Sequence, residues 1–266
     1  MCKDTAKIRK FANMITKNRI KFIRSLEQKK YRKVHGCFVV EGPKVVEDML
    51  PAFECEYVTC TREWLDRHVP LPSSCECDEV SEDELRRISF MEHPQQVLAV
   101  FRIPEFPFQK RSAEIDLCLA LDGVQNPGNL GTIIRIADWF GIEHVICSSD
   151  CADLYNPKVV QAAMGSLARV KVHYMDLPAF LRSLEPGTPI YGTLLDGDDL
   201  YKTALSTQGV IVMGNEGNGL SDEVRQLVTS RIKIPSFNTS GSSAESLNVG
   251  VATAVVCSEF KRRSGS

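Results

Sequence analysis

Residues 209–221 read Gly-Val-Ile-Val-Met-Gly-Asn-Glu-Gly-Asn-Gly-Leu-Ser, an apolar run followed by a glycine-rich loop. An apolar run of this length, bounded by turn residues, predicts a buried strand over 209–213. The glycines and asparagines after it are typical of a loop, and Ser221 is a residue type that begins helices. The stretch therefore predicts a buried strand that leads through a polar loop into a helix.

The patterns of strand and helix alternate on both sides of this stretch. We predict further strands at 116–121, 144–148, 170–174 and 189–194, and helices near 131–140, 157–168, 177–184 and 221–228. This alternation predicts an α/β fold, a parallel sheet with helices on both faces. Residues 247–260 predict a last helix that is apolar on nearly every side. Such a helix is buried in the core or against a second subunit.

The preceding part of the chain predicts a second, smaller α/β domain over residues 1–103. Its first 35 residues are expected to be helical, because apolar residues recur at helical spacing. The remaining elements are strands at 37–42, 57–60 and 97–101, and helices that start at Pro43, at Thr61 and after the capping box Ser81-Glu82-Asp83-Glu84. Residues 104–113, with Pro104 and Pro107, are the expected linker to a domain over 114–266.

The charge of the chain is distributed unevenly. The net charge is −2, but the first 35 residues contain twelve Lys and Arg against two acidic residues, and the rest of the chain is acidic. A basic segment is typical of a partner such as nucleic acid, because lysine and arginine release the counterions of phosphates. A solvated helix face explains the same charge, so charge alone leaves both interpretations open.

The ten cysteines are scattered through the chain and do not have the spacing of a zinc site. No apolar run of signal-peptide length follows Met1, and none approaches the ~18 residues of a membrane span. We therefore expect reduced thiols in a cytoplasmic protein that has neither a membrane segment nor a metal.

Three polar loops are predicted at the carboxyl ends of strands, where open parallel sheets bind their ligands. They cover residues 122–131, 214–221 and 235–248. Each loop alone has a purely structural explanation. Asn129 or Thr132 would cap a helix, Arg135 and Asp138 would form a surface ion pair, and Ser246 and Asn248 would cap the last helix. The three loops together, in this order on one sheet, favour a binding site.

The three loops also carry a resemblance to a known family. Asn126-x-x-Asn129-x-Gly131-x-x-x-Arg135, Val212-Met213-Gly214-Asn215-Glu216-Gly217-x-Gly219-Leu220, and Ile232-x-Ile234-Pro235 through Glu245-Ser246-Leu247-Asn248-Val249 resemble the three signature motifs of the SpoU (TrmH-type, SPOUT superfamily) RNA ribose methyltransferases. This resemblance covers about residues 115–260. The basic N-terminal unit, with Phe38-Val39-Val40-Glu41-Gly42, resembles the L30e-like substrate-binding domain that many members carry.

The resemblance implies a fold, a cofactor and partners. The sheet domain would contain a deep trefoil knot, a rare exception to the rule that chains are unknotted. The cofactor would be S-adenosyl-L-methionine, and the substrate a ribose 2′-hydroxyl of RNA. Members are homodimers with the active site at the subunit junction, which would account for the apolar last helix.

The resemblance also assigns residues to the site. Gly214, Ile234 and Leu247 match positions whose backbone holds the adenosine of the methyl donor. The positions that match catalytic ones are Asn129, Arg135, Glu216, Ser246 and Asn248. The chain departs from several relatives in a longer segment, 236–245, before Ser246.

The residue types of the loops suit methyl transfer to a hydroxyl. The sulfonium donor is already a strong electrophile, so the reaction needs no metal, but the hydroxyl must lose its proton. No histidine follows His173 to act as the base. Arg135 stays protonated, so we assign it to the phosphate beside the ribose and to the developing alkoxide. A role for this arginine as the base has been proposed in relatives and stays open.

Two rival functions are weighed against this one. A nicotinamide-dependent oxidoreductase would need Gly-x-Gly-x-x-Gly after the first strand of the sheet, and the order of glycines in 214–219 is reversed. A catalytically inactive RNA-binding or ribosome-assembly module would not need Asn129, Arg135, Glu216 and Asn248. Ribosomal RNA is favoured as substrate over transfer RNA because of the appended N-terminal domain.

Overall fold

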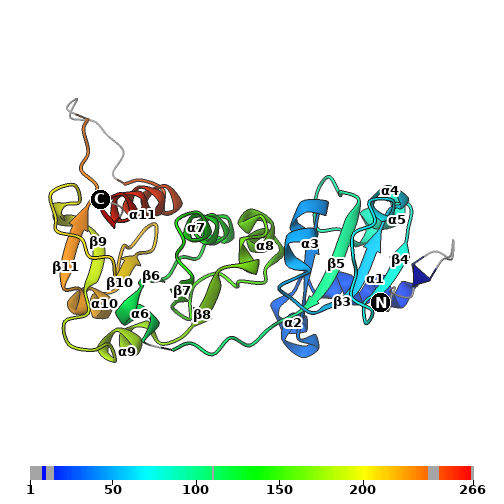
Figure 1. The fold of residues 1–266 in the computed structure, drawn as a ribbon, viewed down its shortest axis with the longest axis horizontal. Coiled ribbons are helices and arrows are strands. Elements are labelled where there is room, and N and C mark those ends of the chain that lie inside the picture. Colours follow the sequence, from blue (N-terminus) through cyan, green and yellow to red (C-terminus); the bar gives the residue numbers. More distant parts are fainter. Residues whose placement is uncertain (1–7, 10–14, 110, 239–245, 265–266) are drawn as a thin grey trace, which may run out of the picture. The chain divides into compact units, whose positions relative to one another are not determined.

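The computed structural model describes residues 8–9, 15–109, 111–238 and 246–264. Contacts within the chain define two compact units. The first unit runs up to Glu105 and includes Tyr155–Ala168, and the second comprises Phe106–Leu154 and the chain from Arg169 onwards. Figure 1 shows the elements of both units, and each is described here by itself.

The second unit is built on a six-stranded sheet in which every pair of neighbours is parallel. Its strands are β6 (Leu117–Leu121), β7 (His144–Cys147), β8 (Lys171–Tyr174), β9 (Ile190–Asp199), β10 (Gly209–Met213) and β11 (Ser230–Lys233), in the order β11-β9-β10-β6-β7-β8. The predicted parallel α/β sheet is confirmed. Strand β11 was missing from the prediction, and the trefoil knot stays a prediction of the resemblance.

The order of the strands reverses direction at the centre of this sheet. The chain proceeds outward from β6 to β7 and β8, and then returns to form β9, β10 and β11 on the other side of β6. In open parallel sheets the crevice at such a reversal is where ligands bind. The two loops that follow β6 and β10 therefore lie at the position where this fold class places a site.

The helices of the second unit cover its sheet and begin close to the predicted positions. They are α6 (Ser112–Ile115), α7 (Pro127–Trp139), α9 (Leu177–Arg182), α10 (Asp222–Leu227) and α11 (Val249–Ser264). The predicted helix at 157–168 is divided into α8 (Pro157–Ala163) and a short 3-10 turn (Ser166–Ala168), because Met164 adopts a left-handed conformation with φ of 50°. Helix α6 overlaps the last two residues of the expected linker, 104–113.

Helix α11 is only partly buried within the chain. One face packs in the core through Thr253, Val256, Cys257 and Phe260, all at most 2% exposed. In contrast, Val251 is 52% exposed. Within this chain, therefore, one face of the helix is buried as predicted and another is not.

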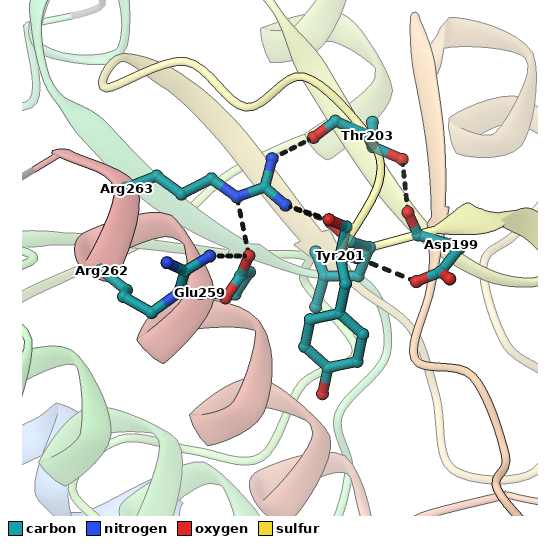
Figure 2. A network of polar contacts seen from close by, with 7 residues as sticks. Asp199, Tyr201, Thr203, Glu259, Arg262 and Arg263 are labelled. Atoms are coloured by element: carbon teal, nitrogen blue, oxygen red, sulfur yellow. Dashed lines mark hydrogen bonds and ion pairs between the residues drawn. The ribbon is translucent and has the colours of Figure 1, made fainter. Parts of the chain in front are cut away.

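The end of α11 is anchored to the turn after β9, as Figure 2 shows. Arg263 donates hydrogen bonds to the backbone oxygens of Thr203 and Tyr201, at 2.5 and 2.6 Å, and to Glu259 at 2.7 Å. Glu259 is 6% exposed and also accepts hydrogen bonds from Arg262. These two arginines lower the pKa of Glu259 to about 2. The pairing of a buried carboxylate with two cations fixes the last turn of the helix.

The first unit contains a mixed sheet and six α-helices among its described residues. Its strands are β1 (Ile8–Arg9), β2 (Cys37–Glu41), β3 (Cys55–Cys60), β4 (Glu76–Glu79) and β5 (Val97–Arg102), in the order β1-β4-β3-β5-β2. Strand β5 is antiparallel to β2 and β3, while β4 is parallel to β1 and β3. Its helices are α1 (Lys17–Ser25), α2 (Lys29–His35), α3 (Pro43–Met49), α4 (Arg62–Leu65) and α5 (Glu82–Ile88), and α8 joins this unit by contacts.

The three strands predicted for the first unit are found as β2, β3 and β5, whereas strand β4 was missing from the prediction. Helix α3 starts at Pro43, and the predicted capping box is formed, since Ser81 and Glu84 exchange hydrogen bonds at 3.3 and 2.9 Å. The expectation that the first 35 residues are helical is wrong at Ile8–Arg9, which pair with β4. The apolar period there was too short to separate helix from strand.

The described part of the chain has no helix that is long and apolar enough to cross a membrane. It contains nine cysteines, all free and buried.

Candidate active site at the carboxyl edge of the sheet

The first polar loop follows β6 and ends in α7. The side-chain oxygen of Asn126 accepts hydrogen bonds from the backbone N–H groups of Gly128 and Asn129, at 2.8 and 3.1 Å. Pro127 occupies the first helical turn, where its missing N–H costs nothing. The cap of α7 is therefore Asn126, and neither Asn129 nor Thr132 has that role. Helix α7 consequently starts four residues before the predicted position.

The second polar loop follows β10 and is closed by its own asparagine. The backbone of Asn215 exchanges two hydrogen bonds with Gly219, at 2.8 and 3.0 Å. The side-chain oxygen of Asn215 accepts from the N–H groups of Gly217 and Asn218, at 2.9 and 3.1 Å. A side chain at Gly214 would place its Cβ 2.4 Å from the carbonyl carbon of Gly219. Only glycine fits at position 214, so the backbone of this loop requires that glycine.

Two hydrogen bonds tie the first loop to the second. The buried carboxylate of Asp122 accepts from the backbone N–H of Ser221 at 2.6 Å, and the side-chain amide of Asn215 donates to the backbone oxygen of Gly123 at 2.7 Å. Neither Asp122 nor Asn215 was predicted to have a role in the site. The sequence offered one signal for them. Asp122 directly follows the apolar strand β6, and Asn215 follows β10 after one glycine.

Three of the five predicted catalytic side chains form one hydrogen-bonded cluster. The side-chain amide of Asn129 donates to the Glu216 carboxylate at 2.7 Å, and that of Asn248 donates to the side-chain oxygen of Asn129 at 3.0 Å. The oxygen of Asn248 also accepts from the N–H groups of Gly250 and Val251 at the start of α11. Residues from the three polar loops therefore meet at one point, although 87 and 119 residues separate the hydrogen-bonded pairs.

The other two predicted catalytic residues do not join this cluster. Arg135 and Ser246 are exposed, and neither makes a hydrogen bond or ion pair with any residue that the structure describes. Arg135 lies six positions after Asn129 on α7, and a rotation of about 100° per residue turns the two side chains to different faces of the helix. Asp138, the expected surface partner of Arg135, instead binds Arg169 through bonds of 2.7–3.0 Å.

The three predicted donor-binding residues lie at the ends of the second and third loops. Gly214 directly follows β10, Ile234 directly follows β11, and Leu247 lies two positions before the first residue of α11. Gly214 and Ile234 are half-buried, and the apolar side chain of Leu247 is 51% exposed. An apolar surface beside backbone polar groups fits a flat aromatic ring such as adenine. The residues present thus fit the donor that the resemblance implies.

The histidines of the sheet do not lie in the described parts of the three loops. His144 and His173 are on β7 and β8, and their ring nitrogens are 3.1 Å apart. Burial lowers the pKa of His173 to about 4, so its ring is uncharged at neutral pH. Residues 15–109, 111–238 and 246–264 also contain no group of three side chains able to hold a metal ion.

Comparison with family models assigns both parts of the chain. The model described as the SpoU rRNA Methylase family matches residues 116–258, and the model described as the MRM3-like substrate binding domain matches residues 17–99. These two ranges contain all the predicted site residues and the basic helices α1 and α2.

Individual relatives cover nearly the whole chain. The 23S rRNA (guanosine(2553)-2′-O)-methyltransferase RlmP of Bacillus subtilis is 30% identical over 240 residues, 90% of this chain and 94% of that protein. A solved structure from Porphyromonas gingivalis, assigned to the TrmH family of RNA methyltransferases, matches with a TM-score of 0.85 and 44% identity over 94% of this chain and all of that one. An AdoMet-bound rRNA methyltransferase from Sinorhizobium meliloti matches with a TM-score of 0.81 and 28% identity, over 94% and 96% of the two chains.

Proposed function

The chain belongs to the SpoU rRNA methylase family, and we propose that it transfers a methyl group from S-adenosyl-L-methionine to a ribose 2′-hydroxyl of ribosomal RNA. The observation that carries this proposal is the cluster of Asn129, Glu216 and Asn248, in which one side chain from each polar loop meets the other two. A relative that aligns over both parts of the chain is a 23S rRNA 2′-O-methyltransferase, which supports ribosomal over transfer RNA. We further propose a cytoplasmic location, which agrees with the bacterial source of that relative.

The methyl donor supplies an electrophilic carbon, and the residues of this chain supply position and charge. Gly214, Ile234 and Leu247 hold the donor's adenosine through their backbone groups. The ribose oxygen forms the new bond to the methyl carbon while the carbon–sulfur bond breaks, and the hydroxyl proton leaves. Alignment of the two reactants accounts for roughly 7–11 kcal/mol of barrier reduction in well-oriented reactions.

Asn129 and Arg135 have different tasks in this reaction. Asn129, held between Glu216 and Asn248, orients the ribose hydroxyl toward the donor. Arg135 binds the phosphate next to the ribose and stabilises the alkoxide as it forms, because a guanidinium donates two parallel hydrogen bonds to an anion. Ser246 lies two residues before Asn248 and completes the edge of the active site. An oxygen of the Asn129, Glu216 and Asn248 cluster receives the proton in this assignment, because the Arg135 guanidinium is already protonated. Arg135 would receive the proton only as a neutral guanidine, which is the alternative role as the base.

The active enzyme is a homodimer in this proposal. Leu247 and Val251 are 51% and 52% exposed at the start of α11, and Trp139 is 85% exposed at the end of α7. Helices α7 and α11 pack against each other, since Gly250 approaches Thr132 so closely that an added Cβ would lie 3.2 Å from its methyl group. Exposed apolar side chains on two adjacent helices are typical of an interface, and a second copy would bury them.

A dimer also gives Arg135 a place in an active site. Within one chain, Arg135 points to a different side of α7 from Asn129 and has no partner among the described residues. An interface at α7 and α11 would bring Arg135 of one subunit to the cluster of the other. The site is then completed by two chains.

The RNA docks on the first unit through its basic helices. Lys17, Lys21 and Lys33 on α1 and α2 are exposed and make no ion pair with the part of the chain that the structure describes. Lysines without acidic partners are available to phosphates, and each phosphate they neutralise releases counterions. The match of residues 17–99 to a substrate-binding model supports this role.

The proposal is tested by transfer of the labelled methyl group of S-adenosyl-L-methionine to ribosomal RNA from cells that lack this protein. We expect the label in dinucleotides that resist alkaline hydrolysis, because a methylated 2′-oxygen cannot attack the neighbouring phosphate. Label on a base would refute ribose methylation. Label only in transfer RNA would refute the ribosomal substrate, and no transfer to any RNA would refute the activity.

A further inference from the structure

The first unit contains a hollow of about 320 Å³ that methyl transfer does not use. It is formed by the start of α3, the residues after β3, the first half of α5 and the residues before β5. The lining residues are Pro43, Thr61, Glu63, Glu82, Leu85, Arg86, Pro94, Gln95 and Gln96. All of them fall within residues 17–99, which match the substrate-binding model.

A buried hydroxyl in this hollow has no hydrogen-bond partner. Thr61 is 9% exposed, and its side-chain oxygen is buried without a partner among the described residues. Its backbone is held in place, because its N–H donates to the backbone oxygen of Gln96 at 2.8 Å. Buried polar groups in native proteins are nearly always hydrogen-bonded, and an exception calls for a partner that the structure lacks. A bound ligand would supply that partner.

The two glutamines beside Thr61 are also available for a ligand. The side chains of Gln95 and Gln96 make no hydrogen bond to the rest of the described chain. Gly42, with φ of 95°, leaves space beside Gln95, since an added Cβ would lie 3.3 Å from the Gln95 side-chain oxygen. An amide offers a donor and an acceptor side by side, which matches the hydrogen-bonding edge of a nucleobase.

The charges around the hollow favour a neutral ligand that donates hydrogen bonds. Glu63 and Glu82 are exposed at its edge, where they repel phosphate but accept hydrogen bonds from amino groups. The cation among the lining residues, Arg86, is paired with Asp83 at 2.7 Å, so its charge is already balanced. The buried side chain of Leu85 and two prolines provide an apolar surface for a flat ring. The volume is at the small end of the roughly 300–1,000 Å³ of small-molecule sites, so it suits a single base and not a helix.

We propose that this hollow takes one unpaired nucleobase of the RNA substrate and prefers a base with an exocyclic amino group. Sequence-specific proteins read RNA mainly at such unpaired bases, through hydrogen bonds and stacking. This proposal rests on the proposed function, because RNA is the partner there. The hollow would select the RNA, whereas the cluster at the sheet edge would act on the ribose.

The test uses the full chain and fluorescein-labelled single-stranded RNA decamers of cytosine, adenine or uracil, with anisotropy as the readout. We expect tighter binding of the cytosine and adenine decamers than of the uracil decamer. Thr61→Val, which removes the hydroxyl and keeps the shape, should weaken cytosine binding about fivefold. Gln96→Leu should weaken it to a similar degree.

Two controls separate binding from folding. Thr61→Val should leave the melting temperature unchanged or higher, because it removes an unpartnered buried hydroxyl. Thr59→Val, the same change two residues earlier on β3 and outside the lining, should leave the Kd unchanged. The exposed Gln208, in the second unit, gives the matching control Gln208→Leu.

Equal Kd values for the three decamers, or unchanged Kd values for both Thr61→Val and Gln96→Leu, would overturn the proposal. A Thr61→Val variant that loses affinity only together with a lower melting temperature would also overturn it. Because no donor is present, these outcomes are separate from the proposed activity. A chain that methylates ribosomal RNA with normal KM in both variants refutes the base site alone.

Discussion

Asn129 and Arg135 lie six residues apart on α7, and the structure holds them in opposite ways. Asn129 is bound on one side to Glu216 and on the other to Asn248. Arg135 extends from the helix with no bond to any part of the chain that is described. One chain therefore fixes the geometry of the Asn129, Glu216 and Asn248 cluster by itself, while it leaves the charge of Arg135 available to groups outside the described chain.

The same contrast appears elsewhere in the molecule. Arg263 is fixed by backbone oxygens and by Glu259, and it ends α11 at a defined place. In contrast, Lys17, Lys21 and Lys33 of the first unit are exposed and have no acidic partner among the residues that the structure describes. Fixed groups are expected to govern geometry and stability, and free cations are expected to govern the contacts with RNA.

The largest effect is expected from removal of Arg135, the side chain that makes no bond to the described chain. Arg135→Ala should lower kcat roughly 10²–10³-fold, because it removes a donor to charge that develops in the transition state. The Kd for S-adenosyl-L-methionine and the melting temperature should not change. Stopped methyl-transfer assays and calorimetric titration measure these quantities, with Arg182→Ala on α9 as the control. Near-normal turnover of Arg135→Ala would contradict the assignment.

The next largest effect is expected from removal of Asn129, the side chain that Glu216 and Asn248 hold in place. Asn129→Ala should lower kcat about a hundredfold, because the ribose hydroxyl loses its orientation. The KM for RNA should change little, since the phosphate contacts remain. Gln208→Ala removes an exposed amide side chain outside the three polar loops and is the control. An Asn129→Ala variant with a higher KM and unchanged kcat would show that Asn129 binds the substrate and does not position it.

A third change tests the anchor of α11. Arg263→Met should lower the free energy of unfolding by about 2 kcal/mol, because backbone oxygens and the Glu259 carboxylate lose a charged donor. Arg262→Met, one residue away and more exposed, should have a smaller effect. Thermal or urea unfolding gives both values. Equal losses in the two variants would contradict the anchor.

The anchor also predicts a dependence of stability on pH. The pKa of Glu259 is lowered from 4.5 to about 2 in the folded chain. The contribution of this carboxylate is therefore present above pH 4.5 and is lost as the pH falls toward 2. Arg263→Met should narrow the difference in stability between pH 6 and pH 3. A difference equal to that of the unchanged protein would count against this pairing.

The smallest effect concerns the free lysines. Replacement of Lys17, Lys21 and Lys33 by alanine should reduce the slope of log K against log salt for RNA binding by about 2. Substitution is preferable to deletion of the segment, because Ile23 and Leu26 of the same segment are fully buried in the core and their loss would destabilise the unit. Donor affinity should be unaffected. An unchanged dependence of RNA binding on salt would show that the RNA does not contact these lysines of α1 and α2.

The sequence predicted the sheet well because its strands are continuous apolar runs separated by glycine-rich loops. It misplaced the start of α7, since both Asn126 and Asn129 are suitable caps and only the backbone shows which one is used. Strand β11 was overlooked because Ser230-Arg231-Ile232-Lys233 has few apolar residues.

The site was predicted in part, for a physical reason. Motif spacing placed Asn129, Glu216 and Asn248 on loops that meet at one sheet edge, and the structure joins them. Other hydrogen bonds join residues that are far apart in the chain. Asp122 and Asn215 connect the first two loops, and Arg263 binds the turn after β9. No local pattern specifies such contacts.

The central claim, that Arg135 of one chain and the Asn129 cluster of another form a single active site, is tested by subunit mixing. Arg135→Ala and Asn129→Ala chains, each expected to keep about a hundredth or less of the wild-type kcat alone, are combined in equal amounts, and methyl transfer to ribosomal RNA is measured. Random pairing should restore about a quarter of the wild-type activity, because half of the dimers contain one complete site of two. A mixture no more active than its separate components would contradict a shared site.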